Sequence, residues 1–293
     1  MTYKTFAVAG GLGGGAPGSA NIGNLIVKHL IEYPDVKVKV LARAGSVNSE
    51  SAKELESLGV TVVPVDYSKQ ETLTAAIKDV QVIISAITTT ALAVQSALVD
   101  AAAAAKKQGS KLELFVPSEF GSDTTDLDES SPLWVKKQLH IQLKELGIPY
   151  TLFISGPFAD WIAAFTGPDE QGKLTIVGTG DEPVGFTSID DTARFIAHAL
   201  ATQSPSELQN AEYRIQGSTA TFNELSKLYQ AKSAKPIEIV HESPEESLKK
   251  FAKGDFIAFL KAEWATGHGL VGEPLRNDVW KEWKPKDIRE FIQ

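Results

Sequence analysis

The sequence predicts an α/β fold: a doubly wound parallel sheet with a smaller C-terminal α/β region. Over residues 1–155, short apolar runs alternate with segments whose apolar residues recur at helical spacing. This order is typical of repeated strand–helix–strand units. The run Val80–Ile87 is almost continuously apolar, as expected of a strand covered by helices on both faces. Ligands of such sheets bind beyond the carboxyl ends of the strands, so residues that directly follow strands are the first candidates for binding.

The elements of this first part follow from apolar periodicity and from glycine or proline at their ends. The expected strands are Thr5–Ala9, Val36–Ala42, Val60–Val65, Val80–Ile87, Leu112–Val116 and Tyr150–Ser155. The expected helices are Asn21–Tyr33, Ser49–Leu58, Glu71–Lys78, Ala91–Lys107 and Pro132–Leu146. The last helix has proline near its start and Gly147 after its end, which is the usual asymmetry of helix termini.

The remaining residues mix strands and helices without a regular alternation. The expected strands are Leu174–Val177, Val184–Thr187, Tyr213–Gln216 and Pro236–Val240. The expected helices are Asp190–Ala201, Phe222–Lys232, Glu245–Lys253, Phe256–Thr266 and Lys286–Ile292. We therefore expect two domains, residues 1–155 with the parallel sheet and residues 156–293, and the second could be interleaved with the first.

Composition limits the classes of function. The chain has 43% apolar and 23% charged residues, the ordinary balance of a soluble globular protein. Its net charge of −8 gives no basic footprint for nucleic acid or for an anionic membrane. There are no cysteines, which excludes disulfides and thiolate chemistry. With no recognisable targeting segment and no apolar run of membrane-spanning length, we expect a cytoplasmic protein.

A glycine-rich stretch from Gly10 to Gly23 joins the first strand to the first helix. Glycine allows the backbone to approach a pyrophosphate closely, and the start of a helix offers free N–H groups and a positive dipole end. In this position the stretch predicts a dinucleotide site and a Rossmann-type sheet; a glycine-rich loop without ligand is the alternative. The register stays open, because a compact turn would begin at Gly10, whereas the literal G-x-G-x-x-G match is Gly13, Gly15 and Gly18.

Arg43 stands at the end of the second expected strand. An acidic residue at this place would accept a hydrogen bond from the ribose 2′-hydroxyl of NAD, whereas an arginine suits a 2′-phosphate through charge-assisted bonds. Arg43 therefore favours NADP(H) over NAD. The alternative is an ordinary solvated surface arginine.

The segment Phe115–Gly121, Phe-Val-Pro-Ser-Glu-Phe-Gly, resembles the signature of isoflavone reductase-like proteins. These belong with the NmrA-like group among the atypical short-chain dehydrogenases/reductases. Supporting similarities are Gly59–Asp66, Val80–Ala86, Gly147–Thr151, Pro157–Ala159 and Trp283–Ile288. The likeness covers nearly the whole chain and is strongest over residues 55–160. It implies an NADP-dependent oxidoreductase, with the cofactor on residues 1–155 and a substrate-binding region on 156–293.

By this resemblance the catalytic residue is Lys136, because the family places a lysine on the helix before the Gly-Ile-Pro-Tyr turn that starts at Gly147. A lysine beside a nicotinamide can act as general acid or base if burial lowers its pKa; a solvated helix lysine is the alternative. His140 lies one turn further along and could join the site, although a partly exposed helix histidine is the simpler interpretation. None of the five histidines forms a helical metal pair, so no metal is expected.

The expected ligand-binding residues combine the glycine turn with positions that the resemblance implies. The cofactor set is Gly10, Gly11, Gly13, Asn21 as helix cap, Ile22, Gly23, Arg43, Ser85, Ala86, Ile87, Lys136 and Phe158. The substrate set is Glu119, Phe120 and Trp161. For Glu119, holding its own loop is an equally good explanation.

Together these residues predict a reductase that transfers hydride from NADPH to a small aromatic or conjugated molecule, as a monomer or homodimer. One alternative is a non-catalytic NmrA-like regulator that senses NAD(P) and binds a partner protein. Another is an isomerase that uses bound nucleotide without net turnover.

Overall fold

The computed structural model describes every residue except 1, 14–20, 89–90, 93 and 293. The chain forms two compact units. Unit 1 consists of Met1–Glu119, Thr124–Phe153 and Thr192–Tyr213, and unit 2 of Phe120–Asp123, Ile154–Asp191 and Arg214–Gln293.

Unit 1 is built on a five-stranded sheet of order β3-β2-β1-β4-β5. Its strands are β1 (Thr5–Ala9), β2 (Lys37–Arg43), β3 (Thr61–Val65), β4 (Val82–Ser85) and β5 (Leu114–Val116). All four neighbouring pairs are parallel. After β3 the chain crosses to the other side of β1, so the strand order reverses between β1 and β4. The predicted doubly wound parallel sheet is confirmed.

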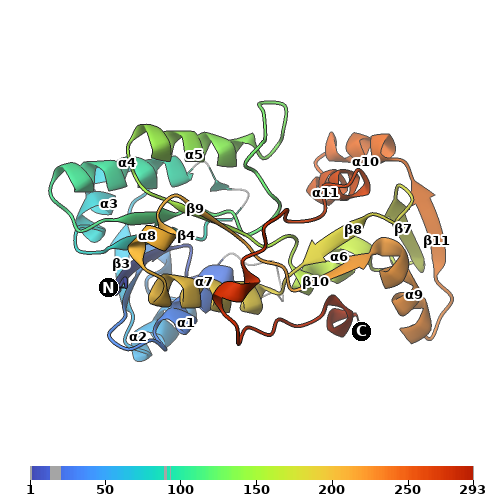
Figure 1. Ribbon diagram of the computed structural model, residues 1–293, viewed down its shortest axis with the longest axis horizontal. Coiled ribbons are helices and arrows are strands. Elements are labelled where there is room, and N and C mark those ends of the chain that lie inside the picture. Colours follow the sequence, from blue (N-terminus) through green and yellow to red (C-terminus); the bar gives the residue numbers. More distant parts are fainter. Residues whose placement is uncertain (1, 14–20, 89–90, 93, 293) are drawn as a thin grey trace. The chain divides into compact units, whose positions relative to one another are not determined.

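Helices cover both faces of this sheet. They are α1 (Ile22–Leu30), α2 (Glu50–Ser57), α3 (Gln70–Ala76), α4 (Val94–Lys107) and α5 (Trp134–Glu145). Figure 1 shows α3, α4 and α5 on one side of the strands and α1 and α2 on the other. A buried cluster joins Ile83 and Phe115 of the strands with Leu98 and Leu139 of the helices. The continuous apolar character of the central strands is explained by this double cover.

The sixth strand, expected in the same sheet, is arranged differently. Strand β6 (Thr151–Ile154) pairs with β9 (Ala211–Arg214). Its link to β5 is an isolated parallel bridge between Phe115 and Tyr150, with Phe115 N donating to Pro149 O at 2.9 Å. The parallel ladder does not continue because β5 is short and ends before Pro117, which has no N–H to donate.

Unit 2 contains two small sheets. Strand β8 (Pro183–Phe186) pairs antiparallel with β10 (Ser218–Thr221), and β7 (Lys173–Val177) pairs parallel with β11 (Glu238–Glu242). Its helices are α6 (Ile162–Thr166), α9 (Phe222–Lys232), α10 (Pro244–Phe251) and α11 (Phe256–Ala265). Helix α7 (Ile189–Thr202) begins in unit 2, and α8 (Pro205–Leu208) belongs to unit 1. The core of unit 2 includes Ile176, Phe186, Phe222 and the fully buried Trp264.

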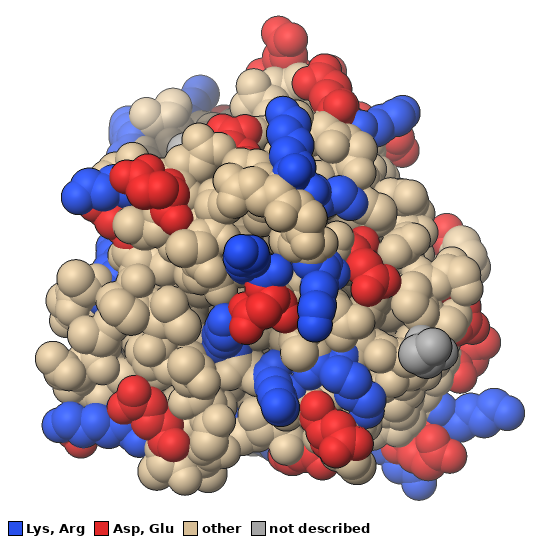
Figure 2. Space-filling view, turned by 90° about the vertical axis from the view of Figure 1, so that its left-hand side faces the viewer, with Lys and Arg blue, Asp and Glu red and all other residues tan. Residues whose placement is uncertain are grey.

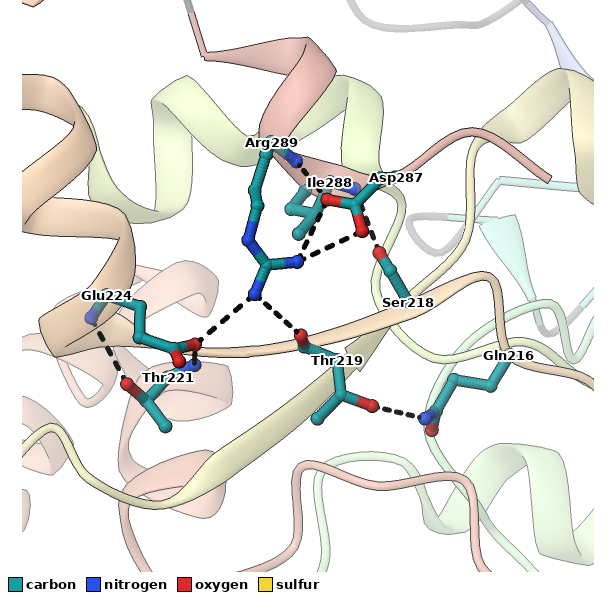
Figure 3. Close-up of polar contacts among 8 residues, drawn as sticks. All are labelled: Gln216, Ser218, Thr219, Thr221, Glu224, Asp287, Ile288 and Arg289. Atoms are coloured by element: carbon teal, nitrogen blue, oxygen red, sulfur yellow. Dashed lines mark hydrogen bonds and ion pairs between the residues drawn. The ribbon is translucent and has the colours of Figure 1, made fainter.

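The C-terminal segment is fixed to β10 by polar contacts (Figure 3). Ile288 is buried, and its N–H donates to Ser218 Oγ at 2.9 Å. Arg289 bonds the carboxylate of Asp287 through Nη1, and its Nη2 lies 3.6 Å from Glu224 Oε2. The helix expected over residues 286–292 is a 3₁₀ turn, Ile288–Phe291, for which Asp287 provides the cap.

Candidate active site

The glycine turn brings the ends of β1, α1 and β4 very close together. Gly10 follows β1 with φ +89°, and a Cβ at this position would lie 2.2 Å from Ala86 O. At Gly23, in the first turn of α1, a Cβ would lie 2.7 Å from Gly10 O and 2.9 Å from Ala86 Cβ. Only glycine fits at either position without a shift of the backbone. The start of α1 is therefore packed against the switch point of the sheet.

Side-chain amides tie the turn to the start of α1. Asn21 is the N-cap, as predicted: its Oδ1 accepts from Asn24 N at 2.8 Å, and its Nδ2 donates to Gly13 O at 3.0 Å. Asn24 Nδ2 donates to Gly11 O at 3.3 Å. These contacts fix the carbonyls of Gly11 and Gly13 toward the helix.

The first turn of α1, which begins at Ile22, contains no acidic residue. A helix start of this kind favours an anionic ligand, because of its free N–H groups and positive dipole end. Gly15 and Gly18, the other members of the literal motif, lie outside the described residues, so the register of the motif stays a prediction.

Arg43 is exposed at the carboxyl end of β2. Its backbone is paired with Val65 of β3, whereas its guanidinium makes no hydrogen bond or ion pair with any residue that the structure describes. It lies near Tyr67: burial raises the pKa of this phenol to about 12, and the charge of Arg43 opposes the increase. The Arg43 guanidinium is therefore available to bind an anion from solution.

Figure 2 views the side of unit 1 that carries β3, α2 and α3. Lysine and arginine side chains gather along the middle of this face, and acidic side chains lie among and around them. On unit 1, Lys39 Nζ of β2 lies 2.5 Å from Asp79 Oδ1, and Lys28 Nζ of α1 lies 2.7 Å from Glu54 Oε1. At these two positions an acidic neighbour neutralises the basic charge.

The end of β4 is buried and joined to the loop after β5. Ser85 is fully buried, and its Oγ has no hydrogen-bond partner among the described residues. Ile87 O accepts from Ser118 Oγ at 2.8 Å, and Ser118 N donates to Gln95 Oε1 at 2.9 Å. Ser118 therefore fixes the two strand ends relative to each other.

A buried cluster of ionisable groups lies where α5 meets this loop. Lys136 is 8% exposed; its Nζ donates to Glu119 O at 2.6 Å and lies 3.8 Å from Glu119 Oε2. The carboxylate of Glu119, which is 3% exposed, accepts from His140 Nε2 and from Thr124 Oγ1, each at 2.7 Å. Lys136 and His140 stand one turn apart on α5, so both side chains leave the same face of the helix.

The two charges of the cluster support each other. Burial lowers the pKa of Lys136, and the nearby charge of Glu119 opposes the decrease. Burial alone would raise the pKa of Glu119, but the charge of Lys136 and the hydrogen bond from His140 hold it below its usual value. A lysine whose pKa is lowered in this way can exchange a proton closer to neutral pH than a solvated lysine.

The expectation of a partly exposed His140 was wrong. The residue is 4% exposed, and its ring stacks on Tyr150 with centroids 5.9 Å apart and planes at 16°. The signal was present in the sequence: His140 follows Leu139 and precedes Leu143 on the buried stripe of α5. A histidine on an apolar stripe, one turn from a candidate lysine, is itself a candidate for a buried polar partner.

Three predicted site residues belong to unit 2. Phe158 is buried and meets Trp161 edge-on, with ring centroids 5.4 Å apart and planes at 88°. The indole of Trp161 is 37% exposed. Phe120, within the Pro-Ser-Glu-Phe-Gly run, is buried and has φ +36°, a backbone conformation that non-glycine residues rarely adopt outside functional or strained sites.

Among the described residues, no helix combines the length and the apolar character needed to cross a bilayer. No group of three or more histidine or acidic side chains in the described part of the chain could hold a metal ion.

The sheet and its helices define a Rossmann-type α/β protein, in which the glycine turn packs the start of α1 against the switch point of the sheet. The profile of the NmrA-like family matches residues 13–292. The phenylcoumaran benzylic ether reductase Pyrc5 of Pyrus communis is 30% identical over 308 residues, covering 94% of this chain and 96% of that protein. The chain belongs to the NmrA-like family, as its sequence motifs indicate.

Other relatives and solved structures agree with this assignment. The isoflavone reductase homolog A622-like of Nicotiana tabacum is 28% identical over 250 residues, or 81% of this chain and 79% of that protein. The binary complex of leucoanthocyanidin reductase with NADPH from Vitis vinifera has a TM-score of 0.81 at 20% identity and covers 98% of both chains. AtPrR2 with NADP+ and (+)pinoresinol has a TM-score of 0.82 at 21% identity, covering 100% of this chain and 98% of that chain. At this level of identity the structural matches establish the fold.

Proposed function

We propose that this chain is an NADPH-dependent reductase that transfers hydride to a small aromatic or conjugated molecule, with Lys136 as general acid or base. The observation that carries the proposal is the buried Lys136 amine, whose pKa burial lowers and which Glu119 holds in place. The relatives support the reaction class, since those compared are named as reductases or as reductase homologues. Two structural neighbours contain NADP+ or NADPH.

The residues at the switch point fit the cofactor. The close packing of Gly10 and Gly23 leaves the backbone N–H groups at the start of α1 to hold a diphosphate. Arg43, exposed and unpaired within the described part of the chain, would bind the 2′-phosphate. Ser85 offers a buried hydroxyl at the end of β4. By the family resemblance, Phe158 of unit 2 would supply the aromatic ring for the nicotinamide. Bound NADPH would supply the hydride.

Lys136 would manage the proton that accompanies hydride transfer. Its Nζ would give a proton to the developing oxyanion of the substrate, or stabilise that oxyanion by a hydrogen bond. Trp161, which is 37% exposed, offers aromatic surface that suits an aromatic substrate, and Phe120 would join it in this proposal. In this proposal residues 1–155 hold most of the cofactor and residues 156–293 most of the substrate. The cytoplasmic location and the monomer or homodimer remain predictions from the sequence.

The test is NADPH oxidation with a panel that includes a phenylcoumaran benzylic ether, pinoresinol and an isoflavone, the compounds named in the relatives. Lys136→Ala should lower kcat by roughly 10²–10⁴-fold, the usual contribution of a positioned proton donor. Lys137→Ala is the matched control: its ammonium bonds Thr125 O on the neighbouring loop, and this variant should keep nearly all activity.

The outcomes separate the proposal from its alternatives. If NADPH binds but no substrate is reduced, the NAD(P)-sensing regulator becomes the better explanation. If the Lys136→Ala variant turns over as fast as Lys137→Ala, the proton-transfer role of Lys136 is wrong. If neither NADPH nor NADH binds at millimolar concentration, both explanations are wrong.

A further inference from the structure

We propose that His140 is a positioning residue for Lys136 and acts through the carboxylate of Glu119. The inference rests on the proposed role of Lys136 as acid or base and adds the device that orients its amine. Its basis is a chain of contacts inside unit 1: His140 Nε2 to Glu119 Oε1 at 2.7 Å, and Lys136 Nζ to Glu119 O at 2.6 Å and Oε2 at 3.8 Å.

The carboxylate of Glu119 is held at both of its oxygens. His140 bonds Oε1, and Thr124 Oγ1 donates to Oε2 at 2.7 Å. An ionised carboxylate only accepts hydrogen bonds, so His140 must carry its proton on Nε2 in this arrangement. With both oxygens fixed, the carboxylate cannot rotate, and its negative charge stays directed at the ammonium of Lys136.

Among the described residues, the ion-pair partner of His140 is Glu119. Tyr150 stacks on the imidazole, and burial, with a smaller contribution from Glu212, raises the pKa of this phenol, so that it stays protonated near neutral pH. On α5, Lys136 stands one turn before His140 and the exposed Lys144 one turn after it, and Thr124 of the loop is uncharged. Glu119 is therefore the group through which a change at His140 reaches Lys136.

Helix α5 explains why these residues act together. Lys136 and His140 are spaced by one turn, so a single carboxylate can meet both. The neighbouring Lys137 bonds Thr125 O instead, so it leaves α5 at a different position and serves as the control.

The experiment measures the titration of Lys136 directly, in protein without coenzyme. Lysine is labelled at 13Cε and 15Nζ, and the Lys136 signal is assigned by its loss in Lys136→Met. In Glu119→Gln the titration midpoint of Lys136 should fall by about 1–3 pH units, because the opposite charge is removed. His140→Leu should also lower the titration midpoint of Lys136. His140→Gln keeps an N–H donor at similar reach and should give a midpoint close to that of the wild type.

A second measurement keeps the inference testable if His140→Leu does not fold. The 15N spectrum of His140 in the otherwise unchanged protein should show a proton on Nε2, and its shifts should change in Lys136→Met, since the two residues share one carboxylate. Lys137→Met is the control and should leave them unchanged. A Lys136 midpoint identical in His140→Leu, His140→Gln and wild type, or His140 shifts indifferent to Lys136→Met, would overturn the inference.

These outcomes do not depend on turnover. If no substrate is reduced, the proposed function fails while the coupling between His140 and Lys136 can still be observed. If the protein is a reductase but the titration is unchanged, only the positioning role fails. In an active protein, the pH profile of kcat/KM should move with the Lys136 midpoint in each variant.

Discussion

The substitution Gly10→Ala tests the close packing at the switch point, and Gly59→Ala provides its control. Both glycines have positive φ, +89° at Gly10 and +85° at Gly59. A Cβ at Gly10 would lie 2.2 Å from Ala86 O, whereas nothing lies within 4 Å of a Cβ at Gly59. The pair therefore separates the backbone penalty, which both variants share, from the steric clash, which only Gly10→Ala has.

The expected magnitudes follow from these two terms. The left-handed backbone costs an alanine about 1–2 kcal/mol, and this should be nearly the whole effect at Gly59. The clash at Gly10 meets backbone atoms that cannot rotate away, which adds about 1–3 kcal/mol. Since 1 kcal/mol changes the midpoint of a protein of this size by about 2–4 °C, Gly10→Ala should unfold at least about 2 °C below Gly59→Ala.

The two variants should also differ in coenzyme affinity if the turn binds a diphosphate. Fluorescence titration should show at least a tenfold weaker NADPH affinity for Gly10→Ala, which corresponds to about 1.4 kcal/mol, and no change for Gly59→Ala. Equal thermal midpoints for the two variants would refute the packing argument. Unequal midpoints with equal NADPH affinities would refute the assignment of the turn as the cofactor site.

Further predictions concern single contacts. Arg43→Ala should weaken NADPH binding by roughly 10–100-fold, the value of a charge-assisted bond, without changing NADH binding, as measured by titration with both coenzymes. Ser118→Ala leaves the buried Ile87 carbonyl without its donor and should lower the free energy of unfolding in urea by about 1–3 kcal/mol. Burial opposes the ionisation of Glu119, but the pKa of this carboxyl is nevertheless lower in the folded protein than its usual value. The charged carboxylate therefore stabilises the folded protein above the unfolded pKa, and this stabilisation is lost as the pH falls through the folded pKa. The stability difference between wild type and Glu119→Gln should therefore shrink from about pH 6 to about pH 3, and a constant difference would contradict the argument.

The parallel sheet could be predicted from the sequence because its signal is local. A strand such as Val80–Ile87 needs only its own apolar run to be recognised, and β4 lies inside it at Val82–Ser85. The position of the glycine stretch between the first strand and the first helix could be predicted for the same reason, since Gly10 follows β1 directly and Asn21 caps α1. These features depend on residues adjacent in the chain.

The errors arose where pairing partners are distant in the sequence. The run Tyr150–Ser155 was correctly read as extended, but β6 pairs with β9, some sixty residues later, and no periodicity reveals that choice. Strand β10, Ser218–Thr221, was missed because it is polar; its place is fixed by hydrogen bonding to β8. The hydrogen-bond partner of His140, Glu119, lies 21 residues earlier on the loop after β5, and no periodicity of α5 reveals it.

The buried cluster on α5 calls for a functional explanation, since stability does not provide one. Burying Lys136 and Glu119 costs each its hydration, and replacing such a pair with apolar residues is often neutral or stabilising by about 1–4 kcal/mol. Leu139 and Leu143 show that this stripe of α5 accommodates apolar side chains. A lysine with a purely structural role would thus be a poor choice at this position. Burial lowers the pKa of this amine, and a carboxylate held at both oxygens orients it. We infer that the cluster is retained in the core for the proton transfer proposed above.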